Sequence, residues 1–310
     1  MPDSFNGWRR KEKVVVVMGA TGTGKSRLSI DLANWFPAEI VNSDKMQVYH
    51  GLDVVTNKVT EEEQCGIPHH LLGIVDPDSD FTGSDFRHLA SLAVGSIVAR
   101  DRLPIIVGGS NSYIEALVDD EELEFRSKYE CCFLWVDVSL PVLHSFVSDR
   151  VDHMIEAGLI DEVRNIFDPE GDYNQGIRRA IGVPEMDRFL RAEAIGADYQ
   201  TRAKLLDEAI NEIKANNCRL ACRQLQKIQR LRTLSGWNIH RLDATDAFLK
   251  RGRESDEAWK NLVAGPSSMI VRRFLYDDEH LTASINSGPT IVSSALSTAV
   301  MGSAVAAASR

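Results

Sequence analysis

Hydrophobic residues are concentrated in short runs along the chain, and amphipathic stretches of helical periodicity separate most of these runs. The runs lie at Val14–Met18, Glu39–Asn42, Leu103–Val107, Phe133–Val138 and Asn238–Leu242. Runs of this length with little polar alternation are typical of strands that are buried on both faces, as in a parallel sheet. The pattern therefore predicts an α/β fold, in which helices flank a mainly parallel sheet.

The middle of the chain has the periodicity of longer helices. Apolar residues recur at helical spacing through His144–Phe167 and again through Asp207–Leu234, which predicts a smaller helical domain beside the sheet. On the second stretch, Arg219, Arg223 and Lys227 are four residues apart and so share one helical face. That face is either a solvated surface or a basic wall beside an anion site, and the spacing fits both interpretations equally well.

The first hydrophobic run leads directly into a glycine-rich segment, which reads Gly-Ala-Thr-Gly-Thr-Gly-Lys-Ser from Gly19 to Ser26. The spacing is that of a P-loop, and the strand before it and the helix after it complete the expected context. Gly19, Gly22 and Gly24 allow backbone N–H groups to turn toward an anion at a helix N-terminus. Lys25 adds a full charge, and the Ser26 hydroxyl can contact a phosphate-bound Mg²⁺. The core is therefore predicted to be P-loop NTPase-like and to bind a di- or triphosphate.

Two further strand ends carry polar turns. Ser43 and Asp44 follow the second run, and Gly108, Gly109 and Ser110 follow the third. Because ligands bind outside the carboxyl ends of the strands in open α/β sheets, these turns and the P-loop should surround one crevice. A carboxylate at Asp44 can hold Mg²⁺, act as a general base or cap the next helix, and the residues alone leave these roles open.

Two other motifs suggest metal binding. Asp137 ends the fourth run, where nucleotide-hydrolysing P-loop proteins place a Mg²⁺ carboxylate, but one acidic residue after a strand is a weak signal. Adjacent side chains such as those of His69 and His70 point in different directions, and no Cys or carboxylate cluster completes a set of ligands. A structural role is the better interpretation of the two histidines.

Composition narrows the choice of partners. The 310 residues include 45 acidic and 35 basic side chains, a net charge of −10, so the surface as a whole repels a nucleic-acid backbone. The five cysteines form no C-x-x-C pair and no zinc spacing, which favours reduced thiols. The first residues lack a secretory signal, and the Ser/Ala/Thr-rich tail has too many small polar residues for a membrane span.

The residues alone suggest a small-molecule or nucleotide kinase as the first hypothesis. The alternatives are a P-loop transferase that uses another diphosphate and a switch or scaffold protein that only binds a nucleotide. The expected domain organisation is a P-loop core at 11–142, a helical subdomain at 143–206, a helix and last strand returning to the core at 207–245, a C-terminal helical segment at 246–281 and a low-complexity tail at 282–310.

Five motifs that follow one another along the chain resemble those of isopentenyltransferases. They are Gly-Ala-Thr-Gly-Thr-Gly-Lys-Ser, Asn-Ser-Asp-Lys-Met-Gln-Val-Tyr, Ile-Pro-His-His-Leu-Leu, Gly-Gly-Ser-Asn-Ser-Tyr and Ile-Arg-Arg-Ala-Ile-Gly-Val-Pro-Glu. The similarity extends from about Val14 to Leu242 and is greatest to the plant adenylate isopentenyltransferases, which make cytokinins. The related tRNA dimethylallyltransferases share most of the motifs.

The resemblance changes the role expected for the P-loop. It implies that the loop, including Thr21 and Thr23, holds the diphosphate of dimethylallyl diphosphate together with Mg²⁺. Asp44 is then the general base for adenine N6, which attacks the dimethylallyl carbon as the diphosphate leaves. Ser43 and Ser110 are expected on the adenine side of the site.

The resemblance also implies basic residues on the diphosphate side. Arg219 and Arg223 match a basic helix of the family there, and Arg150 is a further candidate. Asp137 has no catalytic role in this scheme.

Two departures from the tRNA-modifying relatives bear on the acceptor. Those enzymes resemble one another in a long helical insertion that grips the anticodon stem, and only about a dozen residues, Val118–Tyr129, lie at that position here. The C-terminal Cys/His zinc finger of the eukaryotic tRNA enzymes is also missing. The resemblance therefore implies free ATP, ADP or AMP as the acceptor, with tRNA as the alternative. We expect a monomer in the plastid, with the cytoplasm as the alternative compartment.

Overall fold

Alternate residues of the first strand point into two separate hydrophobic clusters, one on each face of the sheet. Val14 and Val16 belong to one cluster, and Val15 and Val17 belong to the other. All four side chains are completely buried. The continuous apolar run in the sequence is thus explained by a strand that helices cover on both sides.

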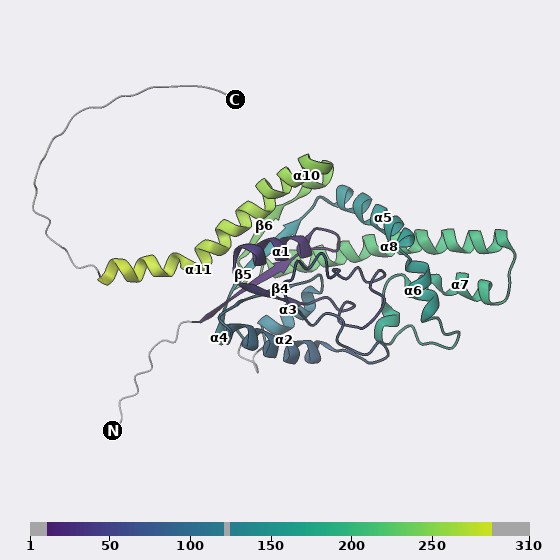
Figure 1. The fold of residues 1–310 in the computed structure, drawn as a ribbon, viewed down its shortest axis with the longest axis horizontal. Helices are drawn as coiled ribbons and strands as arrows, with labels where there is room; N and C mark the ends of the chain where they lie inside the picture. Colours follow the sequence, from purple (N-terminus) through teal and green to yellow (C-terminus); the bar gives the residue numbers. More distant parts are fainter. Residues whose placement is uncertain (1–10, 121–124, 287–310) are drawn as a thin grey trace, which may run out of the picture.

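The computed structural model describes residues 11–120 and 125–286, and this part contains a six-stranded sheet in the order β3-β2-β4-β1-β5-β6 (Figure 1). Every pair of neighbouring strands is parallel. The strands are β1 (Glu12–Met18), β2 (Ala38–Asn42), β3 (His69–His70), β4 (Leu103–Val107), β5 (Tyr129–Asp137) and β6 (Ile239–Asp243). The prediction of an α/β fold with a parallel sheet is confirmed, and the two-residue strand β3 was not predicted.

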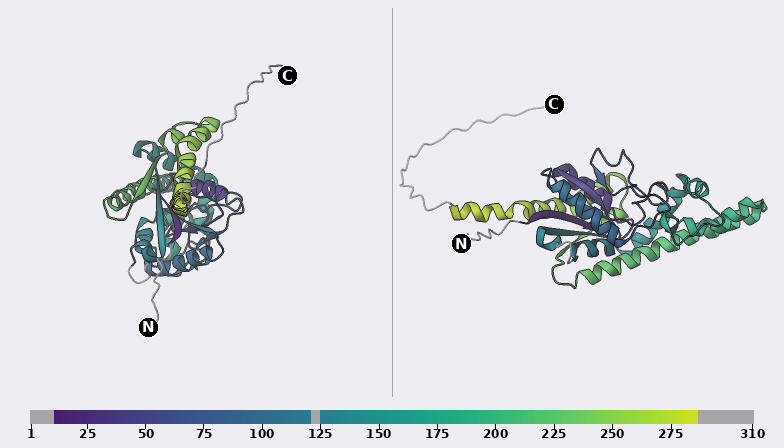
Figure 2. Two further views of the ribbon diagram at one scale, coloured as in Figure 1. Left: turned by 90° about the vertical axis from the view of Figure 1, so that its left-hand side faces the viewer. Right: turned by 90° about the horizontal axis from the view of Figure 1, so that it is seen from below.

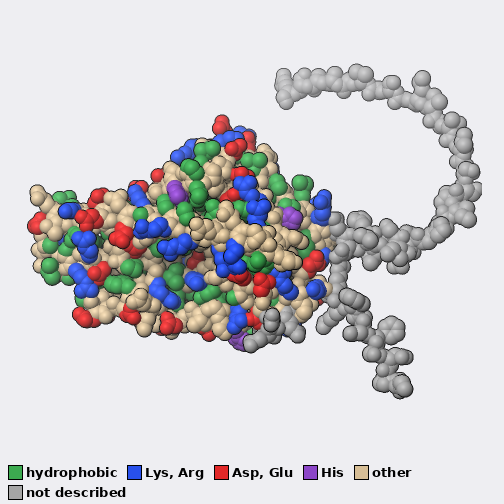
Figure 3. Space-filling view, turned by 180° about the vertical axis from the view of Figure 1, so that it is seen from behind, with side chains coloured by type: hydrophobic (Ala, Val, Ile, Leu, Met, Phe, Trp, Pro, Cys, Tyr) green, Lys and Arg blue, Asp and Glu red, His purple; other side chains and the backbone are tan. Residues whose placement is uncertain are grey.

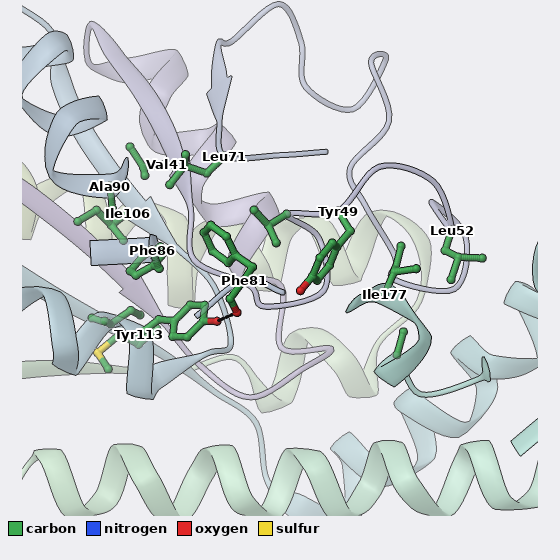
Figure 4. Close-up of a cluster of buried hydrophobic side chains, with 14 of the residues drawn as sticks. Val41, Tyr49, Leu52, Leu71, Phe81, Phe86, Ala90, Ile106, Tyr113 and Ile177 are labelled. Atoms are coloured by element: carbon green, nitrogen blue, oxygen red, sulfur yellow. Dashed lines mark hydrogen bonds between the residues drawn. The ribbon is translucent and has the colours of Figure 1, made fainter. Parts of the chain in front are cut away.

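One layer of helices packs against the face of the sheet that contains Val14 and Val16. It includes α2 (Gly83–Val98), α3 (Asn111–Val118), α4 (Phe125–Lys128), α6 (Leu159–Asn165), the 3₁₀ turn η1 (Gly176–Arg179) and α7 (Val183–Ala194). The aromatic centre of this cluster is drawn in Figure 4. There the rings of Phe86 and Tyr113 stack with centroids 4.8 Å apart, and the Tyr113 hydroxyl donates to the Phe81 carbonyl over 3.1 Å. This packing fixes α3, and with it the polar turn that follows β4.

The other face is covered by α1 (Lys25–Trp35) and by the last helices of the chain. These are α9 (Thr245–Leu249), α10 (Gly252–Trp259), the π-helical turn η2 (Lys260–Ala264) and α11 (Gly265–Asn286). Residues 287–310, which include most of the expected low-complexity tail, lie outside the described residues.

Two long helices connect the layers. The helix expected at His144–Phe167 is divided into α5 (Leu140–Glu156) and α6, because Gly158 between them has a φ of 104°, in the left-handed region. The helix expected from Asp207 begins earlier, as α8 (Tyr199–Leu231), and the Asp198 side chain caps it by accepting from the Thr201 backbone nitrogen. The boundary expected between 206 and 207 therefore lies inside α8.

Helices α7 and α8 extend together beyond the end of the sheet (Figure 2). Figure 3 shows the molecule from behind the view of Figure 1. Basic side chains lie across the middle of this face, with acidic side chains among them. No helix in residues 11–120 or 125–286 combines the length and the hydropathy that a membrane crossing needs.

Candidate functional site

A cavity of about 780 Å³ opens at the carboxyl ends of the central strands. The P-loop after β1, the turn after β2 and the turn after β4 all contribute to its walls. The remaining walls come from α5, α8, α9 and α10 and from loop segments that include residues 55–59 and 179–181. The predicted meeting of three strand-end turns at one crevice is thus observed, and the volume is that of a typical small-molecule site.

The P-loop is shaped by close contacts as well as by its glycines. Gly22 and Gly24 have φ values of 81° and 87°, which side chains rarely tolerate. The Thr23 side chain is buried and donates to the Ala20 carbonyl over 2.9 Å, and a Cβ on Gly19 would lie 2.6 Å from the Val136 carbonyl oxygen.

These contacts divide the P-loop residues into two groups. Gly19 and Thr23 form the loop without lining the cavity. The members that line it are Thr21, Gly22, Gly24, Lys25 and Ser26.

Two basic side chains reach the cavity beside the loop. The Lys25 ammonium donates to the Ala20 carbonyl over 2.6 Å. Burial lowers the pKa of Lys25 to about 8; the Asp44 carboxylate opposes this shift, and the Arg150 charge adds to it. Arg150, on α5, donates through Nη2 to Thr21 Oγ1 over 3.0 Å and to Asn217 Oδ1 over 3.3 Å.

Arg150 is held there in an unfavourable environment. Burial lowers the pKa of its guanidinium, and the buried Nε has no hydrogen-bond partner. Within the described part of the chain neither Lys25 nor Arg150 takes part in a salt bridge with a carboxylate. Two desolvated positive charges without a paired anion are the feature expected of a site that receives an anionic ligand.

Asp44 faces these charges from the turn after β2. Its Oδ1 accepts from the Met46 backbone nitrogen over 3.0 Å, so the carboxylate stabilises the turn and lines the cavity at the same time. The Lys45 backbone nitrogen donates to Ser110 Oγ over 3.0 Å, which joins this turn to the one after β4. Ser110 also lines the cavity, as expected.

The sequence analysis missed Gln224, a buried residue of α8 that connects these parts. Its Oε1 accepts from the Thr21 backbone nitrogen over 2.7 Å, and its Nε2 donates to the Gly109 carbonyl over 2.9 Å. A Cβ on Gly109 would lie 2.4 Å from Gln224 Nε2, so a side chain there would displace this amide. The sequence gives no local signal for this role, because the contact depends on how α8 packs against the two turns.

Outside the P-loop, three expected site residues are not brought to the cavity. Arg219 and Arg223 are exposed and do not line it, and the Nε of Arg219 donates to Asn216 on the same helix over 3.1 Å. The cavity-facing residues of α8 are Asn217, Leu220 and Gln224, and at 3.6 residues per turn both arginines point away from the cavity, Arg219 further than Arg223.

Ser43 is the third of these residues. Its side chain is completely buried and lies against Gly108, where a Cβ would be 2.3 Å from the serine oxygen. It therefore sets the close approach of two strand ends.

The other metal candidates have structural partners. His70 Nε2 lies 2.7 Å from a Glu39 oxygen, and His69 Nδ1 lies 2.8 Å from the Ile67 carbonyl oxygen. Asp137 accepts from Arg241 over 2.7 Å and does not line the cavity. Among the described residues no cluster of three or more His, Cys, Asp or Glu side chains is arranged to hold a metal ion. A Mg²⁺ ion that binds with a substrate does not need such a cluster, because substrate phosphates supply several of its ligands. Ser26, which lines the cavity at the start of α1, can supply a hydroxyl ligand to an ion bound in this way.

A strand, glycine loop and helix that present two cations to a cavity in this way define a P-loop protein that binds a di- or triphosphate. The family model described as IPP transferase matches residues 47–128 and 119–230. The chain belongs to this family.

Two relatives from Arabidopsis thaliana are similar over most of the chain. Identity to "Adenylate isopentenyltransferase 5, chloroplastic" is 66% over 276 residues, covering 88% of this chain and 83% of that protein. Identity to "Adenylate isopentenyltransferase 7, mitochondrial" is 56% over 273 residues, covering 87% of this chain and 83% of that protein. A solved structure of a eukaryotic dimethylallyltransferase acting on tRNA has 25% identity and a TM-score of 0.72, covering 86% of this chain and 80% of that one.

Proposed function

We propose that this protein transfers the dimethylallyl group of dimethylallyl diphosphate to N6 of the adenine in a free nucleotide, ATP, ADP or AMP, and releases diphosphate. This is the first step of cytokinin biosynthesis. The observation that carries the proposal is that one carboxylate, Asp44, lines the same cavity as the two desolvated cations Lys25 and Arg150 and lies near enough to affect their pKa values. High identity to adenylate isopentenyltransferases supports it.

The cations fit the leaving group of this reaction. As the allylic C–O bond breaks, negative charge accumulates on the diphosphate. Backbone N–H groups at the start of α1, Lys25 and Arg150 stabilise that charge without reorganisation of solvent. Mg²⁺, bound through the diphosphate and the Ser26 hydroxyl, would supply further neutralisation of the leaving group.

The Asp44 carboxylate can act on the nucleophile of this reaction, which is adenine N6. The lone pair of adenine N6 is delocalised into the ring, so the amine attacks poorly unless its proton is taken as the new C–N bond forms. Asp44, in reach of the cavity, accepts a hydrogen bond from N6–H and receives the proton as the bond to the dimethylallyl carbon forms. Ser110 and the Gly109 turn form the adjacent wall on the acceptor side.

Free nucleotides are favoured over tRNA as acceptors. Identity to an adenylate isopentenyltransferase is 66%, against 25% for the enzyme whose structure was solved as acting on tRNA. The net charge of −10 agrees with this choice, because a tRNA backbone would meet a repulsive surface.

The reaction can be tested by incubating the protein with ATP, Mg²⁺ and dimethylallyl diphosphate and analysing the products by mass. Prenylated nucleotide is the expected product. ADP together with a phosphorylated acceptor would instead indicate a kinase, and nucleotide binding without any product would indicate a switch or scaffold protein. Parallel reactions with ADP, AMP and unmodified tRNA identify the acceptor, and one with EDTA tests the requirement for Mg²⁺.

We further propose that the protein is a monomer in an organelle, with the plastid as the first candidate. One relative is named chloroplastic and another mitochondrial, which supports an organelle over the cytoplasm. Fractionation of cells that express the tagged full-length protein tests the compartment, and sedimentation tests the oligomeric state.

A further inference from the structure

Trp259 lies directly on the P-loop, although it comes from the C-terminal part of the chain. It is the last residue of α10, is 3% exposed and lines the cavity. A Cβ on Gly24 would lie 2.7 Å from Cη2 and 2.8 Å from Cζ3 of the indole. The ring therefore occupies the space above the α-carbon of the residue that precedes Lys25.

Asp31 fixes the indole in this position. Nε1 of Trp259 donates to Asp31 Oδ2 over 2.8 Å. Asp31 belongs to α1, the helix that begins at Lys25, so the tryptophan is bound to the same helix whose start it covers. Burial raises the pKa of Asp31, while the indole N–H and the Arg27 charge oppose this shift. The mechanism proposed above does not use Asp31.

A second contact holds α10 against the same helix. The Arg27 guanidinium carbon lies 4.8 Å from the centroid of the Trp259 ring, and Arg27 Nη2 donates to Asp256 of α10 over 2.8 Å. The first two turns of α1 are thus held by α10 at Gly24, Arg27 and Asp31. No other element supplies an indole to the lining of this cavity among the described residues.

Gly24 is the residue through which this contact can act on the ligand. Its φ of 87° is in the left-handed region, and the chain enters α1 at this residue, where the first N–H groups of the helix have no partner within the helix. A glycine gains more conformational freedom than other residues when its surroundings loosen. Removal of the indole ring would therefore let the backbone at Gly24 adopt other conformations, and the N–H groups at the start of α1 would lose their fixed positions.

We propose that Trp259 is a positioning residue for the diphosphate: its indole, oriented by Asp31, holds Gly24 and the N–H groups at the start of α1 in their binding geometry. The identity of the diphosphate ester rests on the proposed function. The positioning role does not, because it concerns the diphosphate group alone.

Four variants separate the parts of this contact. Trp259→Phe keeps a ring on Gly24 and removes the N–H donor, and Trp259→Ala removes both. Asp31→Asn keeps an acceptor oxygen for the indole, and Asp31→Ala removes it. Trp237→Phe is the matched control, because Trp237 is also 3% exposed and donates through Nε1 to Asp119 over 3.0 Å, but does not line the cavity.

Two measurements apply to each variant: calorimetric titration with inorganic diphosphate and Mg²⁺, and steady-state kinetics with dimethylallyl diphosphate and ATP. Trp259→Ala should raise the dissociation constant of diphosphate and the KM of the prenyl donor at least about tenfold, with the KM of ATP within about twofold of wild type. Asp31→Ala should raise the same two constants about threefold or more, and Asp31→Asn should restore them. Trp259→Phe should lie between wild type and Trp259→Ala.

The control variant, Trp237→Phe, should have the wild-type dissociation constant for diphosphate and the wild-type KM for the prenyl donor. A lower melting temperature is the only change expected in it. Diphosphate affinity and donor KM within about twofold of wild type in both Trp259→Ala and Asp31→Ala would overturn the positioning role, whatever happened to the melting temperature. If Trp259→Ala does not fold, Asp31→Ala with its Asn rescue decides the question. If the wild type makes no prenylated nucleotide, the proposed function fails, and the diphosphate titrations still decide the role of Trp259.

Discussion

The side-chain oxygen of Gln224 accepts a hydrogen bond from the backbone nitrogen of Thr21 over 2.7 Å. The nitrogen of the same amide donates to the Gly109 carbonyl over 2.9 Å. One side chain therefore sets the distance between the P-loop and the turn beside Asp44, which the proposed function makes the donor and acceptor sides of the cavity. Transfer between two bound substrates depends strongly on such a distance.

We expect Gln224→Glu to lower kcat at least about tenfold, because a carboxylate can still accept from Thr21 but repels the Gly109 carbonyl. Gln226→Glu, an identical change at an exposed position of the same helix, is the control and should retain wild-type kinetics. Steady-state rates of prenylated nucleotide formation measure both. Equal rates in the two variants would show that the amide has no influence on the chemistry.

Asp44→Asn should lower kcat at least about a hundredfold, because the amide cannot take the proton from N6. The variant keeps the size of the side chain and an oxygen that can accept from Met46. Binding of dimethylallyl diphosphate, measured by calorimetry, should therefore survive. The exposed Asp207→Asn serves as the control. A kcat within a few-fold of wild type would remove Asp44 as the base.

Arg150→Met should raise the KM of dimethylallyl diphosphate about tenfold or more, because a charge-assisted contact to the diphosphate is lost. Thermal stability should not fall with it, since the wild-type guanidinium is desolvated and has an unpaired buried Nε. The charge reversals Arg219→Glu and Arg223→Glu should leave the donor KM unchanged. A larger effect from either reversal than from Arg150→Met would place the diphosphate on the other face of α8.

The affinity for dimethylallyl diphosphate should fall above about pH 8. Burial lowers the pKa of Lys25 to about 8 from its ordinary 10.5, so the free protein loses this charge as the pH rises through about 8. The bound diphosphate favours the charged form, so the contribution of Lys25 to affinity is full below about pH 7 and declines by up to tenfold per pH unit above the pKa.

Calorimetric titrations at several pH values measure this profile, with Lys25→Arg as the comparison. The arginine stays charged, so the decline should be absent in that variant even if its affinity is lower throughout. A flat wild-type profile between about pH 7 and pH 9.5 would show that Lys25 keeps its proton.

The parts of the site that the sequence predicts are those encoded by neighbouring residues. The P-loop is a contiguous motif, and Asp44 and Ser110 follow strands that the hydrophobic runs locate. Gln224 and Trp259 act on the P-loop from 203 and 228 residues away, measured from their partners Thr21 and Asp31. No local pattern reports such contacts, because they depend on how α8 and α10 pack.

The incorrect placement of Arg219 and Arg223 at the site shows a second limit of prediction from the sequence. Spacing shows that Arg219 and Arg223 share one side of a helix, but the direction of that side is set by tertiary packing. The buried residues of α8, which include Ile213, Ala221 and Ile228 as well as Asn217 and Gln224, determine its orientation, and both arginines point away from them. The strand β3 escaped prediction for a similar reason, since two residues, His69 and His70, form a strand only because β2 lies beside them.

The contact between Trp259 and α1 also sets the order in which the site is completed during protein synthesis. The P-loop leaves the ribosome early, but the indole that covers it follows Asp31 by 228 residues. At a synthesis rate of about 5–20 residues per second, Trp259 is synthesised roughly ten to fifty seconds after Asp31. The nascent chain thus carries a complete P-loop motif long before α9 and α10 can complete the lining of the cavity.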